Sequence, residues 1–354
     1  MQYIVLIFSG VAVWMLAGME VLAAGSTNAP LKKENPVHTI MIVSSMDGSE
    51  QKALFYFPPE SAPDQKGEPV PLLVQLHTWG GSYAQCSGYP SDKKWAMIAP
   101  DFRGPNTRPE ACASKLAIQD VLDAVEYAKK NARIDKSRIY LCGNSGGGHM
   151  ALMMAAKAPN VWAGVSAWVP ISDLMAWRIH HGDKGYGKNM DNACGGAPGT
   201  PATDAEYKAR SPINFLPAAK DLPLDINAGI HDGHEGSVPI SQSLYAFNVL
   251  AEANGFKDRQ ISEADIQFMT REAKVPPALA GETENDPERK CAVLFRRTAG
   301  PVRITLFEGG HAAEAGAAWN WLGRQKKGAP ACFEIPKSAD GIKSSASGVQ
   351  DVAK

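Results

Sequence analysis

Short apolar runs rich in β-branched and aromatic residues alternate with longer helical patterns along most of this chain, and this alternation limits the folds that it can adopt. The runs are HTIMIVSS (38–45), ALFYFP (53–58), PLLVQLH (71–77), WAMIAP (95–100), RIYLCG (138–143), WAGVSAWVP (162–170), PLDINAGI (223–230) and VRITLFEG (302–309). The later runs are continuously apolar, which is typical of parallel strands that helices bury on both faces. The sequence therefore predicts an α/β fold with a mostly parallel central sheet and helices on both faces.

Three stretches depart from this alternation. Residues 171–222 are rich in Gly, Asn, Asp and aromatic side chains, and we expect a small lid-like insertion there. Residues 272–290 are polar and contain prolines, as surface insertions do. Residues 335–354 are small and polar, which is typical of a disordered tail. Because 44% of the chain is apolar, we predict one large domain over residues 25–334.

The first residues combine an apolar run with small residues at Ala23 and Ala24, as a secretory signal peptide does. We expect residues 1–24 to be removed and the mature protein to be secreted or periplasmic. An uncleaved membrane anchor is the alternative, because the start of the run lacks Lys and Arg. Glu20 argues against it, since it interrupts the run before the ~20 residues that a membrane span needs.

The net charge argues against nucleic acid and membrane surfaces as partners, and the cysteines bear on the cellular compartment and on metal binding. The formal net charge is −1, which provides no basic field for nucleic acid and no polybasic block for a membrane surface. The six cysteines fit an oxidising compartment, where an even number can pair. They form no CxxC and no zinc-ligand spacing with histidines, so we expect no metal site. The oligomeric state is left open.

The segment GNSGG (143–147) matches the pattern G-x-S-x-G and lies between a buried strand pattern and the helical pattern GHMALMMAAKA. In this context the motif lifts a serine out of the sheet, because small residues two before and two after it allow a sharp turn. The N–H groups and dipole at the start of the helix also favour a developing oxyanion. Ser145 is therefore the candidate nucleophile. A glycine-rich turn with an incidental serine is the alternative.

A serine hydroxyl needs a base, and the base needs a group that orients it. Asp232 follows the strand pattern PLDINAGI, and His311 follows the last strand pattern. The order Ser145, Asp232, His311 is the serine, acid, histidine order of strand–elbow–helix hydrolases. Glu235 is near enough in sequence to be the acid instead. Asp232 is favoured because it lies nearer the end of the strand.

The reaction also needs two donors for the oxyanion. The N–H of Gly146, directly after the nucleophile, is one candidate. The loop after the third strand, QLHTWGGSY (75–83), offers the second, and the N–H of Trp79 is the candidate by position. Many such loops have glycines where this chain has Thr78 and Trp79, which leaves the identity of the donor open.

The lid-like insertion carries side chains that suit a substrate pocket. Trp177 and Tyr186 are candidates for an apolar or sugar-stacking surface, and His180 and His181 for pocket-lining groups. Packing inside the protein is the alternative for all four.

With these segments in place, residues 50–325 resemble an α/β-hydrolase, and more narrowly the catalytic domain of the prolyl oligopeptidase family. The narrower resemblance rests on GNSGGGHMAL, on PDFRG after the fourth strand, on RSPI before the acid strand and on VPISQS after the acid. It implies Ser145 as nucleophile, Asp232 as acid and His311 as base, with Gly146 and Trp79 as oxyanion donors.

The chain departs from that family in two respects. It has no room for the N-terminal β-propeller of prolyl oligopeptidases, and its acid loop HDGHEGSVP is two residues longer than usual, which keeps Glu235 open.

We therefore expect a secreted serine hydrolase that needs no cofactor and cleaves a carboxylic ester or a peptide bond through an acyl-enzyme. A carbohydrate or polymer acyl ester is the favoured substrate, because an ester asks less of its leaving group than an amide. A serine-type peptidase is the first alternative. The second is a non-catalytic binding module on a hydrolase fold, although such proteins usually lack the nucleophile or the histidine.

Overall fold

The computed structural model describes residues 37–335. The expected signal peptide and the expected tail beyond residue 335 lie outside the described residues. The strands are β1 (His38–Val43), β2 (Glu50–Tyr56), β3 (Val70–Leu76), β4 (Ala96–Pro100), β5 (Ile134–Asn144), β6 (Gly164–Trp168), β7 (Leu224–Gly229), β8 (Val293–Ala299) and β9 (Val302–Phe307). All eight predicted runs form strands. The sequence pattern missed β8, because Arg296 and Arg297 interrupt its apolar residues.

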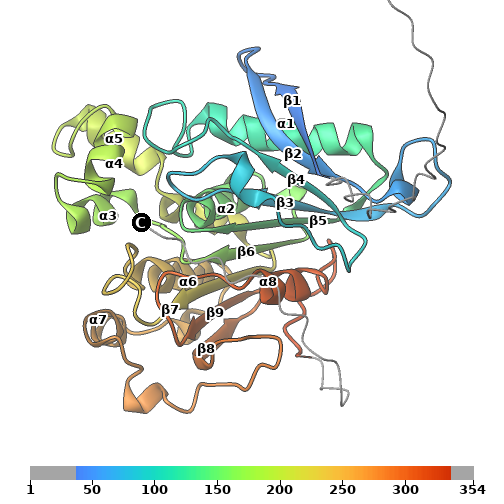
Figure 1. Cartoon of the computed structure of the whole chain (residues 1–354). Helices are drawn as coiled ribbons and strands as arrows, with labels where there is room; N and C mark the ends of the chain where they lie inside the picture. Colours follow the sequence, from blue (N-terminus) through green and yellow to red (C-terminus); the bar gives the residue numbers. More distant parts are fainter. Residues whose placement is uncertain (1–36, 336–354) are drawn as a thin grey trace, which may run out of the picture. The chain divides into compact units, whose positions relative to one another are not determined.

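Within residues 37–335 these strands form one sheet in the order β1-β2-β4-β3-β5-β6-β7-β9-β8 (Figure 1). The inner neighbours from β4 through β3, β5, β6 and β7 to β9 are all parallel. The pairs β1–β2, β2–β4 and β8–β9 at the two edges are antiparallel. The predicted α/β fold with a mostly parallel sheet is confirmed, and it is the α/β-hydrolase arrangement.

The helices are α1 (Lys115–Asn131), α2 (Gly146–Lys157), α3 (Leu174–His181), α4 (Tyr186–Cys194), α5 (Pro201–Ala209), α6 (Ser241–Ala253), α7 (Glu263–Glu272) and α8 (Ala315–Leu322). Helix α1 is capped by Ser114, whose side chain accepts a hydrogen bond from the N–H of Ala117 at 3.1 Å. None of the helices in the described part of the chain is long and apolar enough to cross a bilayer.

Helices cover both faces of the sheet, as expected, but unequally. Helices α1, α2 and α6 supply Val121, Met153 and Phe247 to the large core on one face. On the other face, Trp321 of α8 and Tyr140 of β5 belong to one buried cluster. Both sides of β5 are thus buried, so its carboxyl end is held firmly where the following turn begins.

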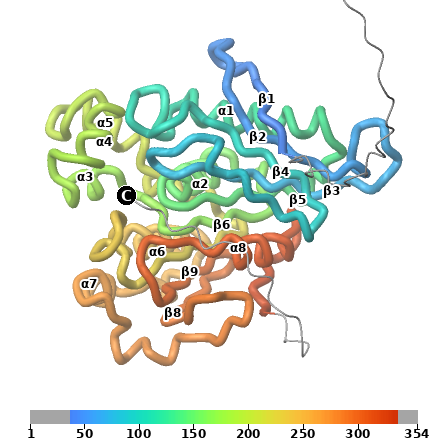
Figure 2. The backbone as a smooth tube through the Cα atoms, in the orientation of Figure 1, coloured from blue at the N-terminus to red at the C-terminus, as the bar shows by residue number. Residues whose placement is uncertain are grey.

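The insertion expected at residues 171–222 lies between β6 and β7. It contains α3, α4 and α5, which we call the lid (residues 174–209), and two short 3-10 turns at Pro212–Asn214 and Leu216–Ala219. Figures 1 and 2 show the three lid helices grouped together at one end of the sheet.

All six cysteines lie within the described residues, and each carries a free thiol. Burial raises the pKa of Cys86, Cys142 and Cys194 to about 12, so these thiols stay protonated at neutral pH. They therefore act as small apolar packing groups.

Candidate active site

Ser145 lies on the turn between β5 and α2, in the strand–turn–helix context that the sequence predicts. Its backbone has φ 57° and ψ −119°, and its N–H donates to the carbonyl of Trp168 at 2.9 Å. A Cβ on Gly143 would overlap the carbonyl of Gly147, which shows how closely the two arms of the turn approach. The small residues on either side are therefore required by the turn itself.

A buried Asp232 and a partly buried His311 form a pair just after the ends of β7 and β9. The Nδ1 atom of His311 lies 2.7 Å from Oδ2 of Asp232, and the carboxylate is 1% exposed. The N–H groups of Gly233 and Val238 donate to Oδ1 at 3.0 and 3.1 Å. Because an ionised carboxylate only accepts, Nδ1 must carry the proton, and Nε2 of His311 is left as the basic nitrogen.

Glu235, the other candidate acid, is placed differently. Its side chain is exposed, and it forms no hydrogen bond with His311 among residues 37–335. A Cβ on Gly310, the residue before His311, would lie 3.7 Å from Oε2 of Glu235, so this carboxylate is near the histidine but not bonded to it. The structure therefore brings Asp232, and not Glu235, to the histidine.

The three side chains share one edge of the sheet. Strands β5, β6, β7 and β9 are consecutive parallel neighbours, so their carboxyl ends, which lead into Ser145, Asp232 and His311, all lie at that edge. Ser145 Oγ and Nε2 of His311 are not hydrogen-bonded in the described structure. In hydrolases without substrate this bond is often long and tightens when substrate binds.

Trp79 and Gly146 bring two backbone N–H groups together. A Cβ on Gly146 would overlap the backbone nitrogen of Trp79, so the loop rests directly against the first residue of α2. Within residues 37–335 neither N–H has a hydrogen-bond acceptor. The loop is braced from behind, because Nε2 of His77 lies 2.8 Å from the carbonyl of Asp101 and the N–H of Asn106 donates to the carbonyl of Trp79 at 2.8 Å. Two unpaired donors beside a serine are the requirement for stabilising an oxyanion.

Residues 232–238, which we call the acid loop, wrap closely around the Asp–His pair. A Cβ on Gly236 would overlap Oδ1 of Asp232 and lie 2.5 Å from Cβ of His311. Sequence reasoning gave Gly236 no role, because a single glycine in a polar loop carries no signal of what it packs against.

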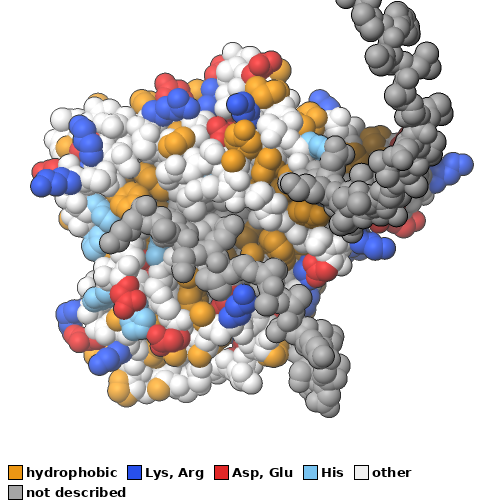
Figure 3. Space-filling view, viewed as in Figure 1, with side chains coloured by type: hydrophobic (Ala, Val, Ile, Leu, Met, Phe, Trp, Pro, Cys, Tyr) orange, Lys and Arg blue, Asp and Glu red, His pale blue; other side chains and the backbone are white. Residues whose placement is uncertain are grey.

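The lid side chains proposed as substrate contacts do not behave alike. Trp177 is fully buried, and its Nε1–H donates to the carbonyl of Ser237 at 2.7 Å, so the expected substrate contact is wrong for this residue. His181 is partly buried and turns Nε2 toward the same carbonyl at 2.8 Å. His180 and Tyr186 are exposed. Figure 3 shows histidine and hydrophobic side chains gathered on the side of the molecule where the lid lies.

The motif residues that carry the family resemblance fasten the ends of the lid. Arg210, from RSPI, donates through Nη1 to the carbonyl of Ala111 at 2.9 Å. Gln242, from VPISQS, accepts through Oε1 from the N–H groups of Ser172 and Asp173 at 2.8 and 2.7 Å. These bonds hold the two ends of the lid in place. The sequence pattern did not indicate this role for Arg210 and Gln242.

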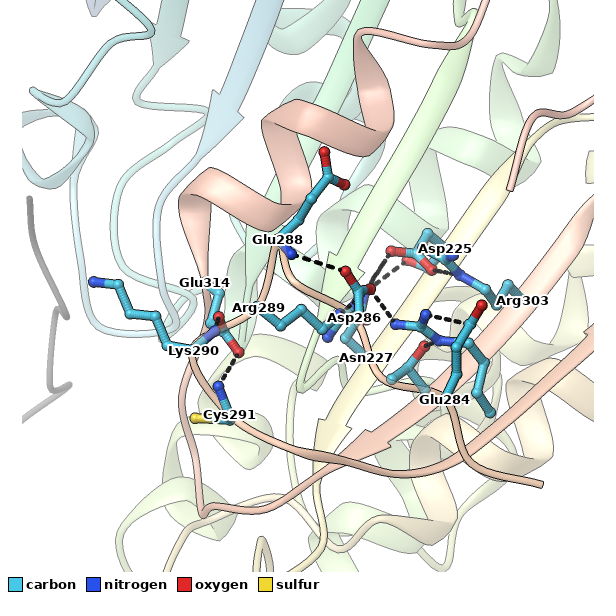
Figure 4. Close-up of polar contacts among 12 residues, drawn as sticks. Asp225, Asn227, Glu284, Asp286, Glu288, Arg289, Lys290, Cys291, Arg303 and Glu314 are labelled. Carbon is cyan, nitrogen blue, oxygen red and sulfur yellow. Dashed lines mark hydrogen bonds and ion pairs between the residues drawn. The ribbon is translucent and has the colours of Figure 1, made fainter. Parts of the chain in front are cut away.

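The segment 272–290 was expected as a surface insertion. It contributes a buried cation, Arg289, which contacts polar side chains of β7. The side chain of Arg289 is 2% exposed and donates to Oδ1 of Asn227 at 2.5 Å, while Arg303 donates to Oδ1 of Asp225 at 2.7 Å (Figure 4). Burial opposes ionisation of Asp225, but Arg303 and Arg289 outweigh it and hold the pKa of that carboxyl below its usual range. The surface expectation is wrong for Arg289, because the loop folds back to neutralise a carboxylate inside the sheet.

An elbow serine, a hydrogen-bonded Asp–His pair and two unpaired N–H groups at the carboxyl edge of this sheet define a serine hydrolase of the α/β-hydrolase class. Residues 112–271 match the model of the prolyl oligopeptidase family, and the resemblance drawn from the motifs is thereby confirmed over that segment.

Solved structures of similar fold include peptidases and an esterase. An acylaminoacyl peptidase from Pyrococcus horikoshii is 18% identical with a TM-score of 0.47, over 61% of this chain and 35% of that chain. A puromycin-hydrolyzing peptidase from Mycobacterium tuberculosis is 18% identical with a TM-score of 0.49, over 62% of this chain and 34% of that chain. A thermostable esterase is 16% identical with a TM-score of 0.47, over 83% of this chain and 64% of that chain. The chain spans about a third of the length of the two peptidases.

Proposed function

We propose that this hydrolase works through an acyl-enzyme on Ser145. His311 Nε2 takes the hydroxyl proton as Oγ attacks the substrate carbonyl, and the N–H groups of Gly146 and Trp79 stabilise the tetrahedral oxyanion. Asp232 holds the imidazole and stabilises its positive form. The protonated histidine then gives its proton to the leaving group. The neutral ring next takes a proton from the water that attacks the acyl-enzyme, and it returns that proton to Ser145 Oγ as the acid leaves.

The observation that carries this proposal is the 2.7 Å contact between Nδ1 of His311 and Oδ2 of Asp232. It assigns the proton of the neutral ring to Nδ1 and leaves Nε2 as the base. A ring held in the opposite tautomer would have no lone pair for the serine proton.

For the substrate, we propose a carboxylic ester, such as a carbohydrate or polymer acyl ester. Exposed Tyr186 and His180 on the lid offer flat side chains that suit stacking against a sugar or an apolar acyl group. A serine-type peptidase is the second candidate, because the matching family model is that of a peptidase family.

The first experiment is labelling with a fluorophosphonate, which reacts with activated serines. We expect the wild-type protein to be labelled and Ser145→Ala to stay unlabelled while folding normally by circular dichroism. A folded wild type that resists labelling would favour the binding-module alternative.

A second experiment separates the two reactions. Hydrolysis of p-nitrophenyl acetate and of a proline-containing peptide amide are measured in parallel, with Ser145→Ala as the background. Ester hydrolysis without amide hydrolysis supports the favoured substrate. Hydrolysis of the peptide alone would replace it with a peptidase.

We also propose export, based on the composition of residues 1–24. Expression of the whole chain followed by N-terminal sequencing of the mature protein tests it. A new N-terminus near Ala24 supports cleavage, and an intact N-terminus in the membrane fraction supports the anchor.

A further inference from the structure

One carbonyl of the acid loop accepts two hydrogen bonds from the lid. Nε1 of Trp177 and Nε2 of His181 lie 2.7 and 2.8 Å from the oxygen of Ser237. The two donors are four residues apart on α3, so they face the same side of the helix. A carbonyl oxygen has two lone pairs, and here both are used by side chains of one helix.

The residues on either side of Ser237 touch the Asp–His pair directly. The N–H of Val238 donates to Oδ1 of Asp232 at 3.1 Å. On the other side, Gly236 packs so closely against Asp232 and His311 that it has no room for a Cβ. A movement of the Ser237 carbonyl must therefore move groups that contact the pair.

Trp177 also contacts the loop that carries Trp79, the candidate oxyanion donor. Its ring packs edge-on against the ring of Trp79, with 4.8 Å between ring centroids and 71° between planes. Trp79, Trp177 and Val238 belong to one buried cluster under the lid. One lid side chain thus contacts both the acid loop and the loop that carries the oxyanion donor.

We propose that Trp177 and His181 are positioning residues through which helix α3 holds the acid loop and so keeps Asp232 aligned with His311. This inference rests on the proposed function of that pair. The two side chains act through the Ser237 carbonyl, and neither takes part in the proton transfers. In consequence the lid supports the chemistry of the site by holding the acid loop in place.

The test compares variants that remove or keep each donor. His181→Phe keeps a ring but removes the N–H, His181→Gln keeps an amide N–H of similar reach, and Trp177→Phe removes the indole donor. Ile179→Ala on the same helix is the control, because the Ile179 side chain is 73% exposed. Melting temperature is recorded for every variant, so that loss of fold is separated from loss of alignment.

For His181→Phe we expect kcat to fall about two- to tenfold, the effect of one lost hydrogen bond, with KM within twofold of wild type. The acid limb of the pH profile of kcat/KM should move to lower pH, because a misplaced carboxylate supports the imidazolium less well. His181→Gln should restore both quantities. The Nδ1–H proton of His311, observed by NMR in 15N-labelled protein, should exchange faster with solvent in His181→Phe and in Trp177→Phe.

A change in KM alone, with the pH profile and the exchange of the His311 proton as in wild type, would overturn the inference, because it would make α3 a substrate contact. Failure of the proposed function looks different. In that case wild-type protein is not labelled by fluorophosphonate, while the NMR comparison still reports whether α3 holds the Asp–His pair.

Discussion

Nδ1 of His311 lies 2.7 Å from Oδ2 of Asp232, although 79 residues separate the two in the chain. They meet because β7 and β9 are adjacent parallel strands whose carboxyl ends lie side by side. The sequence alone left open whether Asp232 or Glu235 is the acid that pairs with His311. The contact selects Asp232, since Glu235 lies in the same loop but is exposed.

Asp232→Asn should lower kcat by ~10⁴, because an amide in that place favours the wrong imidazole tautomer, as in other serine hydrolases. Glu235→Gln is the matched control and should keep kcat within about twofold of wild type. Steady-state hydrolysis of p-nitrophenyl acetate measures both. If Glu235→Gln were the inactive variant, the acid would have to be reassigned.

Gly146→Ala should impair both activity and stability. Its Cβ would overlap the backbone nitrogen of Trp79, so the loop must shift away from the oxyanion position. We expect kcat to fall by ~10²–10³, as for loss of one oxyanion donor, and the free energy of unfolding to drop by ~1–3 kcal/mol from overpacking. Activity assays and urea unfolding measure the two effects.

The control for this change is Gly316→Ala on α8, where an added Cβ meets nothing within 4 Å. It should leave activity unchanged. A Gly146→Ala variant that stays as active as Gly316→Ala would mean that the clash at Gly146 is relieved without moving the loop.

The stability of the fold should fall in mild acid because of His149. This side chain is fully buried, its Nε2 lies 2.7 Å from the carbonyl of Arg210, and Nδ1 has no partner in residues 37–335. Burial lowers the pKa of His149 to about 4. Between the unfolded value of ~6.5 and that folded value the unfolded chain binds more protons, so stability is lost as pH falls through this window.

The expected loss from this residue is ~3 kcal/mol between pH 6.5 and pH 4, with no further change above pH 6.5. Urea unfolding of wild type and His149→Gln at pH 7.5 and 4.5 isolates it, since glutamine can still donate to the carbonyl of Arg210. The exposed His180→Gln is the control and should follow wild type. A His149→Gln protein with the full acid sensitivity of wild type would assign that sensitivity to other groups.

Asp225→Asn should destabilise the fold by ~3–5 kcal/mol, because it leaves the buried cation of Arg303 without its carboxylate. The exposed Asp258→Asn removes the same charge at the surface and should change the free energy of unfolding by less than ~0.5 kcal/mol. Chemical unfolding of the two variants at neutral pH checks the difference. Similar small effects for both would show that neighbouring groups compensate inside the sheet.

Much of the fold follows from local sequence signals. Eight of the strands coincide with apolar runs of the sequence. The turn around Ser145 could be predicted because it depends only on adjacent residues, namely glycines on both sides and a helix that follows.

The remaining features depend on contacts between distant segments. Trp177 was expected to face substrate, yet it is buried because Ser237, 60 residues later, offers an acceptor inside the protein. Arg289 was expected at the surface, yet it is buried because β7 carries a carboxylate and an amide that pair with it. Neither partner is visible in the sequence around the residue itself.

The backbone of Ser145 has φ 57° and ψ −119°, a conformation that suits glycine and costs other residues ~1–3 kcal/mol. Ser145→Gly should therefore unfold at a higher temperature than wild type and be inactive. The best residue for folding and the best residue for catalysis differ at this position. A screen of variant libraries for thermal resistance alone would accordingly enrich glycine at position 145 and discard the nucleophile, so any effort to stabilise this protein must select for turnover at the same time.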